Sequence, residues 1–120
     1  PVNDTYGHAV GDIILKAVAE RCHQLLRLVD ILARYGGEEF VALLPDTDLE
    51  TACRIAERLR EATESMLTTV DGITIAVTIS LGVAELTADT VDLAALFERA
   101  DQAQYRAKQA GRNRVKVFQA

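Results

Sequence analysis

Apolar side chains recur every three or four positions along three stretches of the chain, which is the period of a helix. These stretches are residues 9–26, residues 49–66 and a segment that begins near Asp92 and stops at Gly111. The second follows Thr47-Asp48-Leu49-Glu50, a capping box typical of a helix N-terminus. The third has a stripe rich in alanine, which consists of Leu93, Leu96, Ala100, Ala103, Ala107 and Ala110. We therefore predict three helices, the last of them closely packed.

Four shorter segments have the composition of strands. Residues 31–35 and 40–44 are apolar runs on either side of Gly36-Gly37-Glu38-Glu39, whose glycines suit a hairpin turn. Residues 73–83 alternate large aliphatic with small or polar side chains, which predicts one long strand. Residues 114–118 can form a last short strand. The order of elements predicts an α/β sandwich, in which helices flank a central, mostly antiparallel sheet.

Composition excludes several classes of protein. The length of 120 residues fits one domain, and the apolar fraction of 49% with 26% charged residues is typical of soluble globular proteins. The formal net charge is −5, the wrong sign for a general nucleic-acid surface, so a phosphate ligand would need local features. No apolar run has the length of a membrane span, and we expect a cytoplasmic segment without direct membrane contact. The full-length protein could still be anchored to a membrane through upstream segments.

The segment Arg34-Tyr35-Gly36-Gly37-Glu38-Glu39-Phe40 carries the most specific candidate chemistry. Two glycines allow backbone N–H groups to come close to a phosphate. The carboxylates that follow can hold a divalent cation that bridges it. An ordinary turn with two solvated glutamates is the alternative, and these residues taken alone favour it.

Further motifs favour the phosphate-binding interpretation over an ordinary turn. They are residues 3–8, Gly11-Asp12, Ser80-Leu81-Gly82-Val83, Ala100-Asp101 and residues 105–113. In this order and spacing, and together with the glycine-rich signature, they closely resemble the GGDEF family of diguanylate cyclases in its GGEEF variant. The resemblance covers essentially the whole chain and implies one GGDEF domain over residues 1–120. It also implies a fold similar to nucleotidyl cyclases and polymerase palms, with a ferredoxin-like core, and the condensation of two GTP molecules into cyclic di-GMP with release of two pyrophosphates.

The resemblance implies roles for the signature residues. Glu38 would be a ligand of the catalytic Mg²⁺ (or Mn²⁺). Gly36 and Gly37 would let the backbone approach the GTP phosphates. Glu39 would be the neighbouring catalytic carboxylate, with a role at the ribose 3′-hydroxyl.

Four residues outside the signature would bind substrate by the same resemblance. Asn3 and Asp12 would read guanine, because an amide and a carboxylate match the donor and acceptor edges of that base. Lys108 and Arg112 would hold phosphates. The alternatives are that Asp12 simply favours a helix N-terminus, and that Lys108 and Arg112 are ordinary cations near a helix C-terminus.

The sequence Arg27-Leu28-Val29-Asp30 predicts a second site, with five residues between Asp30 and Gly36. In the family, an RxxD motif at this offset is the inhibitory site for the product cyclic di-GMP, and Arg58 falls where a secondary contributor is often found. An arginine can pair with phosphate or stack on guanine while an aspartate accepts from the base edge. A solvated charge pair is the alternative.

The chain departs from the family pattern at its start. The family's domain begins with a helix and a strand that carry an Asp-x-Asp-Phe-Lys type segment, whose first aspartate is the second metal-binding carboxylate. That segment would precede Pro1. We therefore expect that the numbering starts partway through a domain, that a fragment of residues 1–120 is unstable, and that it is inactive by itself.

Three functions follow from these observations. The leading hypothesis is a diguanylate cyclase that is active as a homodimer, because each domain binds one GTP and the product contains two nucleotides. A sensory or receiver domain would lie upstream. The second hypothesis is an inactive GGDEF module that senses cyclic di-GMP or GTP. The third is a regulatory or scaffold domain that binds no nucleotide.

Overall fold

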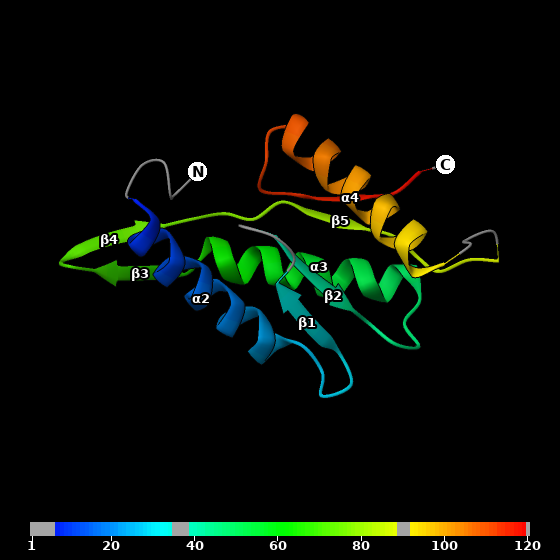
Figure 1. The fold of residues 1–120 in the computed structure, drawn as a ribbon, viewed down its shortest axis with the longest axis horizontal. Helices are drawn as coiled ribbons and strands as arrows, with labels where there is room; N and C mark the ends of the chain where they lie inside the picture. The colour runs from blue at the N-terminus through cyan, green and yellow to red at the C-terminus, as the bar shows by residue number, and fades with distance from the viewer. Residues whose placement is uncertain (1–6, 35–38, 89–91, 120) are drawn as a thin grey trace. The chain divides into compact units, whose positions relative to one another are not determined.

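A computed structural model describes residues 7–34, 39–88 and 92–119 (Figure 1). The chain divides into two compact units, which we describe separately. The first comprises Pro1–Pro45 and Ala62–Val77, and the second comprises Asp46–Glu61 and Thr78–Ala120. The α/β class is confirmed, and two of the three strand pairs among the described residues are antiparallel.

The first unit begins with the helix α2 (His8–Leu25), which confirms the first predicted helix. Ile14, Val18 and Cys22 are spaced four residues apart and are all buried, as the helical period requires. The helix contacts the strand β3 (Leu67–Val70). Burial raises the pKa of the Cys22 thiol, so this side chain behaves as a small apolar group of the core.

The strands β1 (Ile31–Arg34) and β2 (Phe40–Leu43) pair antiparallel, as predicted. Ile31 lies opposite Leu43, and Arg34 lies opposite Phe40. The register therefore fixes both strands up to the two ends of the GGEEF signature. The predicted turn itself, residues 35–38, lies outside the described residues.

A second hairpin was not predicted from the sequence. The strand β3 pairs antiparallel with β4 (Ile73–Ala76), and Val70 lies opposite Ile73. Asp71 and Gly72 connect them with φ angles of 50° and 79°. Two consecutive left-handed residues suit a two-residue hairpin, and the sequence Asp-Gly is the signal that could have found it.

The prediction of one strand over residues 73–83 is wrong. Two strands, β4 and β5 (Leu81–Val83), occupy its ends, and residues 77–80 are not in a strand. The alternation of side chains indicates an extended backbone. It does not indicate which strand pairs with each end of this segment. Here β4 pairs with β3 in the first unit, whereas β5 pairs with β6 (Val115–Val117) in the second.

The second unit is built around α4 (Leu93–Gln109), which contacts both β5 and β6. The two strands run parallel, and Figure 1 shows α4 alongside β5. This is a strand–helix–strand crossover. Asp92 caps α4 as expected, because its Oδ1 accepts from the backbone N–H of Ala95 at 2.8 Å.

The apolar stripe of α4 is buried at its centre and exposed at its ends. Ala103 and Ala107 have no exposed surface, whereas Leu93 is 52% exposed. Leu93 is the first residue of the helix, and Ala110 is its C-cap. The close packing that the alanines predicted is therefore confirmed only for the middle of the helix.

The remaining helix, α3 (Leu49–Glu64), matches the second predicted helix. Its N-cap is Asp48 rather than Thr47, because Asp48 Oδ1 accepts from the backbone N–H of Thr51 at 2.7 Å. Glu85 Oε2 accepts from the first backbone N–H, that of Leu49, at 3.2 Å. Within the described ranges, no helix is both long and apolar enough to cross a bilayer.

Candidate functional site

Part of the predicted catalytic site lies outside the described residues. Gly36, Gly37, Glu38 and Asn3 belong to this part. Glu39 is described, half-buried, directly before the first residue of β2. Arg34 ends β1 on the other side of the signature. The two strands of the hairpin therefore hold the residues that flank the signature.

Asp12 lies close to this hairpin. It is the fifth residue of α2, beyond the first helical turn. An effect on the helix dipole falls off within the first turn, so the helix N-terminus explains this carboxylate poorly. One oxygen of Asp12 is 3.9 Å from Nη2 of Arg34, and both side chains are exposed. The fold thus brings a predicted guanine-reading carboxylate near the strand that leads into the signature.

The predicted phosphate-binding cations belong to the second unit. Lys108 lies in the last turn of α4, and Arg112 follows the helix; both are exposed. The helix ends in a Schellman motif, in which the N–H of Gly111 donates to Lys108 O at 3.4 Å and that of Arg112 donates to Ala107 O at 3.0 Å. The end of α4 therefore presents both cations on a hydrogen-bonded backbone.

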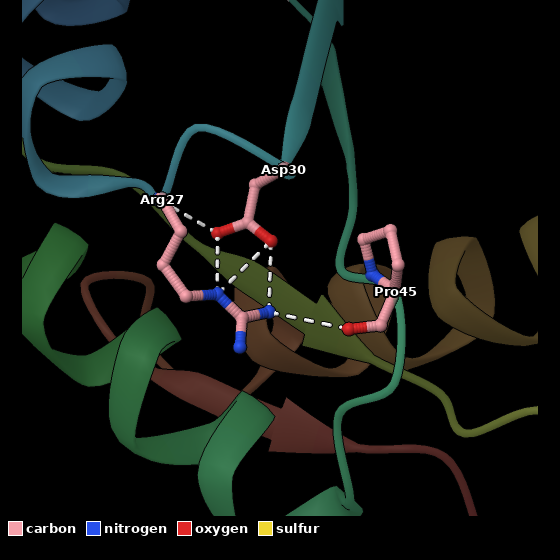
Figure 2. Close-up of polar contacts among 3 residues, drawn as sticks. All are labelled: Arg27, Asp30 and Pro45. Atoms are coloured by element: carbon pink, nitrogen blue, oxygen red, sulfur yellow. Dashed lines mark hydrogen bonds and ion pairs between the residues drawn. The ribbon is translucent and has the colours of Figure 1, made fainter.

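The RxxD motif forms a closed ion pair (Figure 2). Arg27 Nη2 is 2.8 Å from Asp30 Oδ1, and Arg27 Nε donates to both carboxylate oxygens at 3.0 and 3.2 Å. The backbone N–H of Arg27 donates to Asp30 Oδ2 at 2.8 Å. Nη2 also reaches Pro45 O at 3.5 Å. The motif is therefore a turn whose first and last residues are joined by hydrogen bonds.

Burial differs between the two partners of this pair. The Asp30 side chain has no exposed surface, whereas that of Arg27 is 43% exposed. Asp30 is thus not part of a solvated charge pair, although Arg27 can still be reached from solvent. The hydrogen bonds from Arg27 lower the pKa of Asp30. Arg58, the predicted secondary contributor, is exposed on the part of α3 that belongs to the second unit.

The lowered pKa of Asp30 predicts a loss of stability in acid. Its pKa in the folded protein lies below the ordinary value of 3.8, so the pair contributes its full stabilisation above that value and loses it as the pH falls through the folded pKa. We expect the free energy of unfolding to fall between about pH 6 and about pH 3, and to fall less in Asp30→Asn. Urea titrations at both pH values measure this, with the exposed Asp101→Asn as the matched control. An equal fall in Asp30→Asn and the wild type would contradict the prediction.

The described residues do not form a metal site by themselves. No group of three histidine, cysteine, aspartate or glutamate side chains within residues 7–34, 39–88 and 92–119 could hold an ion. The predicted ligand Glu38 lies outside these ranges. The assignment of Mg²⁺ therefore depends on the signature sequence and not on the described geometry.

One hydrogen-bond network at the end of α4 was not predicted from the sequence. Arg60 on α3 donates from Nη1 to Asn113 Oδ1 at 3.0 Å. The backbone N–H of Asn113 donates to Ser80 Oγ at 3.2 Å. Asn113 directly follows Arg112, so the network adjoins a predicted phosphate-binding residue. The polar residues Arg112 and Asn113 directly follow the helix-ending Gly111. This is a weak signal that could have indicated a loop held by hydrogen bonds.

Comparison with known proteins gives consistent matches over nearly the whole chain. The sequence model of the family described as diguanylate cyclase, GGDEF domain, matches residues 1–114. Diguanylate cyclase A of Treponema denticola is 47% identical over 114 residues, which are 95% of this chain and 31% of that protein. The chain thus spans about a third of the length of this curated relative.

Two solved structures have the same fold. The GGDEF domain of DgcB from Caulobacter crescentus, in complex with c-di-GMP, matches with a TM-score of 0.90 and 32% identity, over 98% of this chain and 70% of that one. The active GGEEF domain of a diguanylate cyclase from Vibrio cholerae matches with a TM-score of 0.85 and 32% identity, over 99% of this chain and 75% of that one.

Proposed function

Because this chain belongs to the GGDEF family of diguanylate cyclases, we propose that it condenses two molecules of GTP into cyclic di-GMP and releases two pyrophosphates. The observation that supports this proposal most strongly is the 47% identity to a diguanylate cyclase over 95% of the chain. The GGEEF form of the signature is compatible with catalysis, since a related domain from Vibrio cholerae is described as an active GGEEF domain.

The chemistry of this reaction explains why cationic and carboxylate side chains are needed at the site. Each ribose 3′-oxygen loses its proton and forms a bond to the α-phosphorus of the other GTP, while the bond from that phosphorus to the pyrophosphate oxygen breaks. The transfer requires in-line geometry and neutralisation of the charge on the phosphates. Lys108 and Arg112 would supply positive charge to the phosphates, and Asp12 with Asn3 would orient the guanine. Glu39 would act near the attacking 3′-hydroxyl.

The proposed reaction also needs a divalent cation. We propose Mg²⁺, or Mn²⁺ in its place, with Glu38 as a ligand. Such an ion neutralises phosphate charge when it is bound. The glycines at positions 36 and 37 would leave room for the phosphates beside it.

The stoichiometry implies a homodimer. One domain of this family would hold one GTP, and the product contains two nucleotides. We therefore propose that two copies meet face to face, and that an upstream sensory or receiver domain controls their encounter. The specific activity should then rise with protein concentration.

Product analysis of the natural full-length protein tests the function. The protein is incubated with GTP and Mg²⁺, and the products are separated by chromatography and identified by mass. Cyclic di-GMP and pyrophosphate in a ratio of one to two would support the proposal. A folded dimer that binds cyclic di-GMP without forming it would instead indicate a sensor.

We also propose that cyclic di-GMP inhibits the enzyme at Arg27 and Asp30, with a contribution from Arg58. Arg27→Ala should raise the product concentration needed for half inhibition by about tenfold or more, since a charge-assisted contact to phosphate is lost. The initial rate should not change. Inhibition curves at increasing cyclic di-GMP measure both quantities.

This variant needs its own control, because Asp30 is buried against Arg27. Removal of one partner leaves an unpaired buried charge and destabilises the fold. The double variant Arg27→Ala/Asp30→Ala removes both charges and should show the same relief of inhibition. Inhibition equal to the wild type in both variants would contradict the site.

A further inference from the structure

Three consecutive residues after α4 have a positive φ angle, and only the first is a glycine. The angles are 123° at Gly111, 63° at Arg112 and 49° at Asn113. The Schellman motif that ends the helix needs one left-handed residue, and Gly111 supplies it. Left-handed backbone is unfavourable for a side chain such as that of Arg112, whereas asparagine tolerates it better. The conformation of Arg112 therefore requires support from elsewhere in the second unit.

The next residue, Asn113, is held by two separate elements. Its backbone N–H donates to Ser80 Oγ at 3.2 Å, just before β5. Its side-chain oxygen accepts from Arg60 Nη1 at 3.0 Å, on α3. The two contacts hold the backbone and the side chain of the same residue. Asn113 is thus fixed in both position and orientation.

Arg60 is itself held in place. Its side chain is only 16% exposed. Glu57, one helical turn earlier, accepts from Nε at 2.8 Å and from Nη2 through the same oxygen. These bonds lower the pKa of Glu57. One edge of the guanidinium therefore binds Glu57, while Nη1 remains directed at Asn113. A lysine could not reproduce this planar arrangement.

We propose that Arg60 is a positioning residue for Arg112, acting through Asn113. The inference rests on the proposed function, in which Arg112 and Lys108 bind the phosphates of GTP. The backbone angles of Arg112 set the direction in which its side chain leaves the loop. The Schellman bond to Ala107 O holds the N–H of Arg112, and the contacts of Asn113 hold the peptide that follows it. Arg60 does not touch the substrate in this scheme. It helps to keep the loop in a conformation that is unfavourable for Arg112.

A double-mutant cycle in the natural full-length protein separates positioning from general stability. The wild type, Arg60→Met, Arg112→Ala and the double variant are compared for affinity to a non-reactive GTP analogue, for kcat/KM and for Tm. We expect Arg60→Met to weaken binding about tenfold in the wild-type background. It should cause no further loss in the Arg112→Ala background. Its effect on Tm should be the same in both.

Two further variants sharpen the test. Arg54→Met is the matched control, because Arg54 lies on the same helix in an exposed ion pair with Glu50. It should leave affinity and Tm near their wild-type values. Asn113→Gly permits the left-handed backbone but removes the amide, so it should weaken binding as much as Arg60→Met does. It also replaces Arg60→Met if that variant does not fold.

The outcomes are distinct from those of the proposed function. If the wild type binds the analogue but forms no cyclic di-GMP, the proposed reaction fails, while the binding cycle still decides the role of Arg60. Equal losses of affinity in both backgrounds would overturn the positioning role. So would unchanged affinity in Arg60→Met and Asn113→Gly. A wild type that does not bind the analogue would overturn the inference as well.

Discussion

Replacement of Glu38 by glutamine is expected to abolish cyclic di-GMP synthesis and to leave the fold intact. Glutamine keeps the size and shape of the side chain but removes its negative charge. Mg²⁺ prefers charged carboxylate oxygens, so the variant should lose its proposed ion. Loss of a group that neutralises charge in the transition state costs about a thousandfold or more in rate.

The measurement is the initial rate of product formation at saturating GTP and Mg²⁺. Circular dichroism and Tm report whether the fold is retained. Glu20→Gln is the matched control, since Glu20 is an exposed residue of α2 outside the proposed site. A Glu38→Gln protein with the turnover of the wild type would show that this glutamate is not a metal ligand.

Replacement of Gly82 by alanine should have the largest effect on stability. A Cβ at this position would lie 2.0 Å from Ala100 O, 2.3 Å from Gln104 N and 2.9 Å from Ala103 C. All three atoms belong to the backbone of α4, so no side-chain rotation can relieve the overlap. The helix would have to move away from β5. We expect the free energy of unfolding to fall by about 3 kcal/mol or more.

Gly72→Ala provides the control for this prediction. Gly72 has a φ of 79°, but a Cβ there would meet no atom within 4 Å. Its replacement therefore costs only the strain of a left-handed alanine, about 1 kcal/mol. Urea denaturation of both variants measures the difference. A Gly82→Ala protein no less stable than Gly72→Ala would contradict the close contact between β5 and α4.

The sequence predicted best those elements whose signal lies within one short stretch of the chain. The apolar spacing of α2 identified a helix, and its buried positions Ile14, Val18 and Cys22 followed from the period. The first hairpin followed from two apolar runs around a glycine pair. The sequence failed where pairing depends on distant segments. The alternation over residues 73–83 did not reveal that β4 and β5 join different partners. The hairpin of β3 and β4 is local and was missed, although the sequence Asp71-Gly72 signals its turn.

In the candidate site, too, the sequence predicted residues that belong to motifs and missed contacts that only the fold creates. Motif spacing predicted Asp12, Lys108 and Arg112 as site residues, and their roles stay predictions. The structure places Asp12 near β1 and both cations at the end of α4. The burial of Asp30 could not be predicted, because the RxxD motif left a solvated charge pair open as the alternative. Arg60 gave no signal, because an arginine on an amphipathic helix usually faces water. Its partner Asn113 lies 53 residues away, and only the fold brings them together.

The crossover formed by β5, α4 and β6 has a consequence for the order of folding. Parallel strands usually depend on the closure of a long loop, which costs chain entropy. Here α4 fills the connection, and its contacts with both strands all lie within the continuous segment from Leu81 to Val117. Contacts between residues near in sequence form fastest. The partners in the β3–β4 hairpin lie closer still in sequence, so we expect that hairpin to form first. The crossover needs no residue outside Leu81 to Val117 for its own contacts, so it can assemble independently of the hairpin.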